Sequence, residues 1–261
     1  MESKRLLTDA VNLWRERGDD NWLAMTLVKL SNINQVLGFH KEGMEQAKEA
    51  LGIYEQLGDT LLQAHCLIRL AFLLCSDKQL SAAEEAALRA LDLLLEKGDQ
   101  FWVCKSHRVL GNIYTSKGDT EKAIHHFEVG IGIASAFNWH GSLFWLHYEL
   151  ARLLRIEGRF DDAHVHIEHA KSHTADSAYL LGHAIGSQAL LWYNQHRFEE
   201  ARSGALHAAD IYEKVGAVRD VELCRGLLRM IESSSVASGQ SGFDCELVRT
   251  LLFPARTDSS L

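Results

Sequence analysis

The chain has 261 residues, of which 47% are hydrophobic, 24% are charged and one is proline. This composition is typical of a soluble protein rich in helix, because helix interiors exclude proline. The net charge of −8 argues against broad nucleic-acid binding, which needs a basic surface, and no apolar run approaches the roughly 18 residues of a membrane span.

The five cysteines are scattered and never form a C-x-x-C pair. This pattern indicates reduced thiols that fill the core in a reducing compartment. The first residues, Met1 to Arg5, are not followed by the apolar segment of a signal peptide. We therefore expect a cytoplasmic protein.

The first predicted helix covers residues 5–17. Ala10 and Trp14 stand 40 residues before Ala50 and Tyr54, which belong to the second helix of a predicted helix pair. The first helix therefore corresponds to half a repeat, and its apolar face is only partly covered. We expect this end to take part in self-association or to receive an upstream domain.

Five complete helix pairs are predicted next, from the spacing of apolar residues and of turn residues. The pairs cover 19–37 with 40–57, 60–76 with 79–97, 100–117 with 119–137, 140–157 with 160–174, and 178–195 with 197–215. Their short connections imply that neighbouring helices are antiparallel.

The pairs repeat at intervals of 40 residues. A turn residue followed by aspartate recurs at Gly18, Gly58 and Gly98, and glycine favours the left-handed conformation that ends a helix. Two further series, in the same phase, are formed by Leu30, Leu70, Leu110 and Leu150, and by Ala10, Ala50, Ala90, Gly130 and Ala170. The chain is therefore predicted to be an array of stacked repeats.

The third repeat carries the most specific pattern. It reads Leu110-Gly111-x-x-Tyr114 and then Ala123-x-x-x-Phe127, which places small residues opposite large ones in two packed helices. In this pattern the chain resembles the tetratricopeptide repeat (TPR) family. The repeat length of 40 is similar to that of kinesin light chain arrays and to the C-terminal sensor regions of fungal and bacterial STAND regulators.

The resemblance implies an all-α fold, a right-handed α-α superhelix of five full helix pairs. An N-terminal half repeat and a C-terminal capping helix at about 217–232 complete the array over residues 5–232. Residues 233–242 are rich in serine and glycine and are predicted to be a flexible linker. Residues 243–261 form a tail, in which an apolar stretch predicts a short helix.

The resemblance also implies a concave groove lined by the first helix of each pair. Ten residues are predicted to form a peptide-binding site there: Asn32, Phe72, Lys105, Arg108, Asn112, Trp145, Tyr148, Arg152, Arg155 and Tyr193. None of the groove positions is acidic, although the chain has 35 acidic residues. Such a groove favours an acidic, partly aromatic peptide. The alternative is that acidic residues are simply concentrated on solvated second helices.

Two groove positions have specific alternatives. Asn32 and Asn112 are two repeats apart, and each amide fits either the backbone of an extended ligand or a local bond to the next repeat. Arg108 and Asn112 match the first positions of the carboxylate clamp of chaperone adaptors. Glu149 and His183 occupy later positions where Asn and Lys are needed, so we do not expect chaperone-tail binding.

Neither catalysis nor a cofactor is expected. The sequence contains no nucleophile elbow, phosphate loop or H-E-x-x-H motif. His166, His169 and His173 share one helix face, but a metal site needs ligands that converge from a second element, so packed histidines are the preferred interpretation.

The sequence therefore predicts a non-catalytic scaffold that binds a protein or peptide partner, with no nucleic acid and no membrane. The alternative is a ligand-sensing or autoinhibitory repeat region of a larger STAND-type signalling or transcriptional regulator. In that alternative the apolar tail at 243–253 folds back into the groove.

Overall fold

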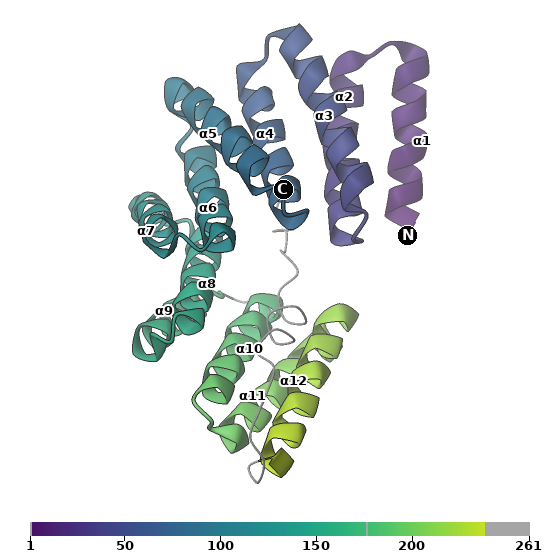
Figure 1. The fold of residues 1–261 in the computed structure, drawn as a ribbon. Helices are drawn as coiled ribbons and strands as arrows, with labels where there is room; N and C mark the ends of the chain where they lie inside the picture. The colour runs from purple at the N-terminus through teal and green to yellow at the C-terminus, as the bar shows by residue number, and fades with distance from the viewer. Residues whose placement is uncertain (1, 176, 238–261) are drawn as a thin grey trace. The chain divides into compact units, whose positions relative to one another are not determined.

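The computed structural model describes residues 2–175 and 177–237, and within these ranges every regular element is an α-helix (Figure 1). The helices are α1 (Glu2–Arg17), α2 (Asp20–Val36), α3 (His40–Leu57), α4 (Thr60–Ser76), α5 (Leu80–Lys97), α6 (Gln100–Lys117), α7 (Thr120–Ala136), α8 (His140–Ile156), α9 (Phe160–Ser172), α10 (Ala178–Asn194), α11 (Phe198–Lys214) and α12 (Val218–Ala237). The predicted all-α fold class and the five helix pairs are confirmed.

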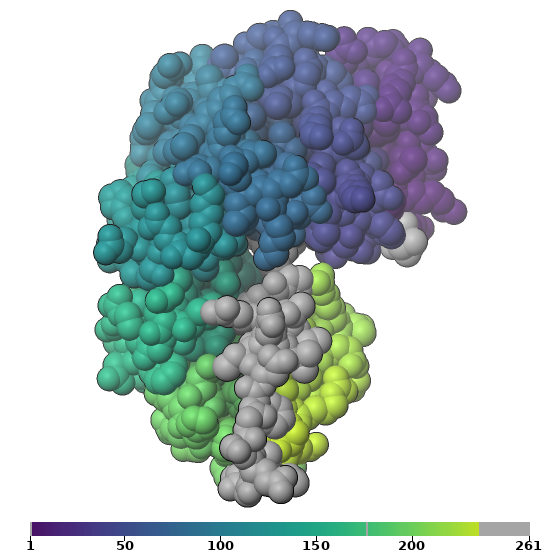
Figure 2. Space-filling view, in the orientation of Figure 1, coloured from purple at the N-terminus to yellow at the C-terminus, as the bar shows by residue number. Residues whose placement is uncertain are grey.

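The described residues form two compact units, one ending at Gly130 and one beginning at Ile131, so that α7 contributes to both. In the first unit each helix from α1 to α6 packs on the next, and α4 also contacts α2 and α6. In the second unit α8 to α12 follow the same rule, with α10 contacting α8 and α12. The first helices of successive pairs therefore lie side by side in each unit, and the purple and blue surface of α1 to α5 is continuous (Figure 2).

The turns between pairs have a common construction. Gly58 and Gly98 both have a φ of 71°, a left-handed conformation that costs glycine little. The aspartate that follows each glycine caps the next helix: Asp59 accepts a hydrogen bond from the Leu62 backbone N–H at 3.0 Å. The glycine ends one helix and the aspartate begins the next, which explains why the two residues recur together.

Three other turns place a residue with a side chain in the same left-handed conformation. They are Lys78, Asn138 and His196, with φ values of 63°, 54° and 58°. Lys78 and Asn138 stand at positions where the 40-residue series predicts a turn. The geometry of the turn is therefore retained where glycine is not.

The signature of the third repeat is a close contact between α6 and α7. Phe127 is fully buried, and a Cβ atom placed on Gly111 would lie only 2.5 Å from its ring. In the second unit, a Cβ on Gly182 would lie 2.8 Å from the ring of Tyr212. Glycine is required at both positions because an aromatic ring occupies the space of a side chain.

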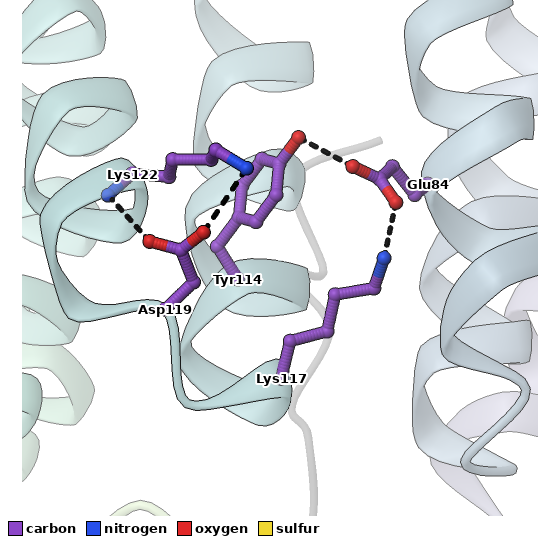
Figure 3. A network of polar contacts seen from close by, with 5 residues as sticks. All are labelled: Glu84, Tyr114, Lys117, Asp119 and Lys122. Atoms are coloured by element: carbon purple, nitrogen blue, oxygen red, sulfur yellow. Dashed lines mark hydrogen bonds and ion pairs between the residues drawn. The ribbon is translucent and has the colours of Figure 1, made fainter.

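A polar network joins α5 of one pair to α6 of the next (Figure 3). The Tyr114 hydroxyl donates to Glu84, and Lys117 forms an ion pair with the same carboxylate. Asp119 accepts from the backbone N–H of Lys122 at 3.2 Å and pairs with its ammonium at 3.1 Å. The hydrogen bonds from Lys117 and Tyr114 lower the pKa of Glu84, which favours its charged form.

The two ends of the array differ in how far they are covered. In α1, Leu6 and Leu13 are 57% and 43% exposed, as expected for half a repeat, and the predicted docking role of this end stays a prediction. At the other end α12 runs to Ala237, five residues beyond the predicted end of the capping helix, and Ser233 donates back to the Met230 carbonyl at 2.9 Å. The remainder of the predicted linker and the tail at 243–261 lie outside the described residues.

None of the described helices combines the length and the hydropathy needed to cross a bilayer.

Candidate functional site

A pocket of about 230 Å³ lies in the first unit, against the first helices α2, α4 and α6. Its basic lining residues are Lys29, Arg69, Lys105 and Arg108, and its aromatic ones include Tyr54, Phe72 and Trp102. No acidic residue is among the described residues that line it. The volume is at the lower end of the range of small-molecule pockets, which start at about 300 Å³.

Three of the basic residues are buried. Arg69, Lys105 and Arg108 are 6%, 5% and 9% exposed. One nitrogen of Arg69, Nη1, donates to Oδ1 of Asn32 and to Oε1 of Gln35, both at 3.0 Å. These acceptors are neutral amides, so burial lowers the pKa of Arg69 to about 10.

Aromatic rings surround the remaining charge. The ammonium of Lys105 lies 4.5 Å from the ring centre of Phe101 and 5.0 Å from that of Trp102. The ring of His65 stacks on Trp102 with 3.8 Å between centres. Burial lowers the pKa of His65 to about 4, so its imidazole is neutral at pH 7. The positive charge of the pocket therefore comes from lysine and arginine.

Four of the five residues predicted for the groove in the first unit line this pocket. These are Asn32, Phe72, Lys105 and Arg108, whereas Asn112 is a partly buried residue of α6 outside the lining. The amide of Asn32 is engaged by Arg69 of the next pair. This contact corresponds to the local-bond alternative for Asn32.

In the second unit the predicted residues contact one another or neighbouring helices. Trp145 is buried and packs edge-on against Tyr148, with 5.6 Å between ring centres. Arg155 donates to Oδ1 of Asn194 at 3.0 Å, and Tyr193 shares a hydrogen bond of 3.1 Å with Ser234. Burial lowers the pKa of Arg155 to about 10.

The charge of this second set is smaller than its sequence indicates. Arg152 Nε donates to Glu149 Oε2 at 2.8 Å, and Glu149 is only 8% exposed. The positions predicted for the groove contain no acid, but this carboxylate stands three residues away on the same helix. The acid-free basic surface is therefore a property of the first unit.

The histidines form stacked clusters. Nδ1 of His147 lies 2.9 Å from Nδ1 of His166, and its ring stacks on that of His169 with 4.9 Å between centres. Burial and the neighbouring histidines lower the pKa of His147 to about 3. In the described part of the chain no group of histidine, cysteine and carboxylate side chains has the arrangement of a metal site.

Arg69 is the functional candidate that the sequence reasoning missed. It follows Ile68, which the predicted register placed in the groove, so the error in direction was one residue. A usable signal existed, because Arg69 is the single Arg, Lys, Asp or Glu in the segment Thr60–Ser76. A lone charged residue in an apolar helix requires a buried partner.

No family model and no curated protein sequence matches this chain. Solved structures match it along most of its length. A Rap protein in complex with competence and sporulation factor superposes with a TM-score of 0.62 and 14% identity, covering 89% of this chain and 71% of that one. Aspartyl phosphate phosphatase F from Bacillus subtilis gives a TM-score of 0.59 and 15% identity, covering 85% and 62%.

A third likeness is to the nearly identical TPR-like repeats of a putative kinesin light chain from Podosopora anserina. It has a TM-score of 0.57 and 16% identity and covers 74% of this chain and 96% of that one. These identities establish the fold alone, and the resemblance to STAND regulators stays a prediction. The chain therefore has the fold of the TPR-like repeat proteins.

Proposed function

We propose that this chain is a non-catalytic interaction module that binds an acidic, aromatic-containing segment of a partner protein on the faces of its first helices. The observation that carries the proposal is the pocket of the first unit, where basic and aromatic side chains line one surface without an acid. Carboxylates bind to such cations through charge-assisted hydrogen bonds, and aromatic side chains stack on the rings.

The fold supports this proposal. A repeat fold presents the side chains of several consecutive helices on one continuous face, which suits an extended ligand. One of the similar structures is a complex of a Rap protein with competence and sporulation factor. Another similar protein is named as a phosphatase, but at 15% identity that name carries no activity over to this chain.

The remaining parts of the proposal concern the setting. The cysteines at 66, 75, 104 and 224 are buried free thiols, which supports a reducing compartment such as the cytoplasm. The net charge of −8 supports a protein partner over a nucleic acid.

A selection of random displayed peptides tests the proposal. We expect the selected peptides to be enriched in aspartate, glutamate and aromatic residues, and their binding to weaken with salt because the contacts are ionic. Enrichment of basic peptides, or no selection above background, would contradict the proposal.

Charge removal then locates the bound peptide. The double variant Lys29→Gln and Arg152→Gln removes one cation from a first helix in each unit, and we expect it to lower affinity several-fold. The matched control is Arg89→Gln with Arg202→Gln, which removes the same charge from exposed positions on the second helices α5 and α11. Equal affinities of the two double variants would place the peptide elsewhere.

A further inference from the structure

The pocket of the first unit contains polar nitrogens that its own walls do not satisfy. Gln35 Nε2, His65 Nε2 and Arg108 Nη1 are shielded from solvent and have no hydrogen-bond partner among the described residues. Gln35 is 3% exposed and Arg108 is 9% exposed. An unsatisfied buried donor costs about 1–3 kcal/mol, and a charged one costs more. These atoms therefore mark the position of a missing acceptor.

The acceptor that fits is an anion. Arg69 and Lys105 accompany Arg108 in the same wall, and all three are more than nine-tenths buried. The hydrogen bonds of Arg69 go to neutral amide oxygens, which leave its charge uncompensated. Buried cations require a negative partner, because desolvation is not repaid by neutral acceptors.

The nearest acids of the helix starts already have another role. Asp59 caps α4 by accepting from Leu62, and Asp99 caps α6 by accepting from the backbone N–H of Trp102 at 3.1 Å. Neither residue lines the pocket. The anion must therefore come from a ligand.

The other walls specify the body that carries the anion. Phe72 and Trp102 offer ring faces, and Val28 and Ile68 add apolar surface. A space of about 230 Å³ accommodates a group of the size of one aromatic side chain with its acid. The pocket thus combines a cationic end with an apolar, aromatic one.

We propose that this pocket is a binding site for a small aromatic carboxylate, held by Arg108, Gln35 and the charge of Arg69 and Lys105. The inference rests on the proposed function for its choice of ligand face. The carboxylate belongs either to a free aromatic acid or to an acidic residue beside an aromatic one in a bound segment. The chemistry required of the pocket is the same in both cases.

Two probe pairs separate these sources, with binding followed by NMR chemical shifts of the full chain. The first pair is phenylacetate and its uncharged amide, phenylacetamide. The second pair is the blocked dipeptide acetyl-Asp-Phe-amide and its Asn-Phe counterpart. Preference for phenylacetate identifies a site for free aromatic acids, and preference confined to the Asp dipeptide identifies a site for a segment of a partner. Equal binding within both pairs, or no binding, would overturn the inference.

The variant Arg108→Gln should weaken the preferred probe about tenfold or more, because it removes a charge-assisted hydrogen bond. Arg89→Gln is the control, since it removes the same charge from an exposed position of α5. Should Arg108→Gln disturb folding by circular dichroism, Gln35→Met removes a second donor at similar volume. Unchanged probe affinity in the folded variant would also overturn the inference.

The outcomes distinguish this inference from the proposed function. A displayed peptide that binds while neither probe pair shows a preference keeps the interaction module and removes the pocket as an acid site. A preference for phenylacetate in a chain that selects no peptide keeps the pocket and removes the interaction module.

Discussion

Close packing between a glycine and an aromatic ring is the smallest unit of this fold. The ring of Phe127 occupies the space that a Cβ on Gly111 would need, at 2.5 Å. Phe127 is fully buried, so its ring cannot turn toward solvent without leaving a cavity. The position of one missing methyl group therefore fixes how α6 and α7 approach.

The variant Gly111→Ala should lower the free energy of unfolding by about 1–3 kcal/mol, because it overpacks this contact. Urea unfolding followed by circular dichroism measures the loss. The control is Gly132→Ala, at a helical position with open space around it, which should raise stability by about 0.5–1 kcal/mol. A Gly111→Ala protein as stable as the parent would show that the ring contact is not tight.

Residue identity could be predicted from the sequence only where a partner stands at a fixed repeat offset. Gly111 and Phe127 belong to a known signature, so their contact could be predicted. The bond between Asn32 and Arg69 joins two helix pairs and depends on side-chain direction, which a register error of one residue changes by about 100°. The pairing of Arg152 with Glu149 was accessible, since residues three apart on a helix are neighbours.

At the scale of the helix, the turn between pairs determines where each element begins and ends. Asp99 accepts from the Trp102 backbone N–H and satisfies one of the free donors at the start of α6. Gly98, directly before it, ends α5 with a φ of 71°. Because the same two residues recur at each interval of 40, the helix bounds could be predicted to within a few residues.

Replacement of Asp99 by alanine should therefore cost about 1 kcal/mol, the usual effect of losing a side-chain cap. The change is measured as a lower midpoint of urea unfolding. Asp92→Ala serves as control, since Asp92 is an exposed residue inside α5 and alanine is the better helix former there. Equal losses in the two variants would mean that the effect comes from charge and not from the cap.

At the scale of the whole chain, stability should depend on pH through the histidines. Burial is the first cause of a lowered pKa at His65 and His107, to about 4, and at His147, to about 3. The ordinary pKa is 6.5, so the unfolded chain binds more protons than the folded one below that pH. Stability is complete above pH 6.5 and is lost as the pH falls toward the folded-state values.

Thermal unfolding at pH 7 and pH 5 tests this dependence above the range in which most carboxylates titrate. We expect Tm to fall by several degrees between the two conditions. The variant His147→Gln should reduce the fall, because it removes the group with the lowest folded-state pKa. A Tm that does not change between pH 7 and pH 5 would contradict the predicted burial of these rings.

The central claim is that the first helices carry the binding face. Hydrogen exchange with and without an acidic, aromatic peptide from the display selection measures this most directly. The account predicts slower exchange in first helices, chiefly α2, α4 and α6, with unchanged exchange in the second helices α3, α5, α9 and α11. Protection confined to the second helices would contradict it.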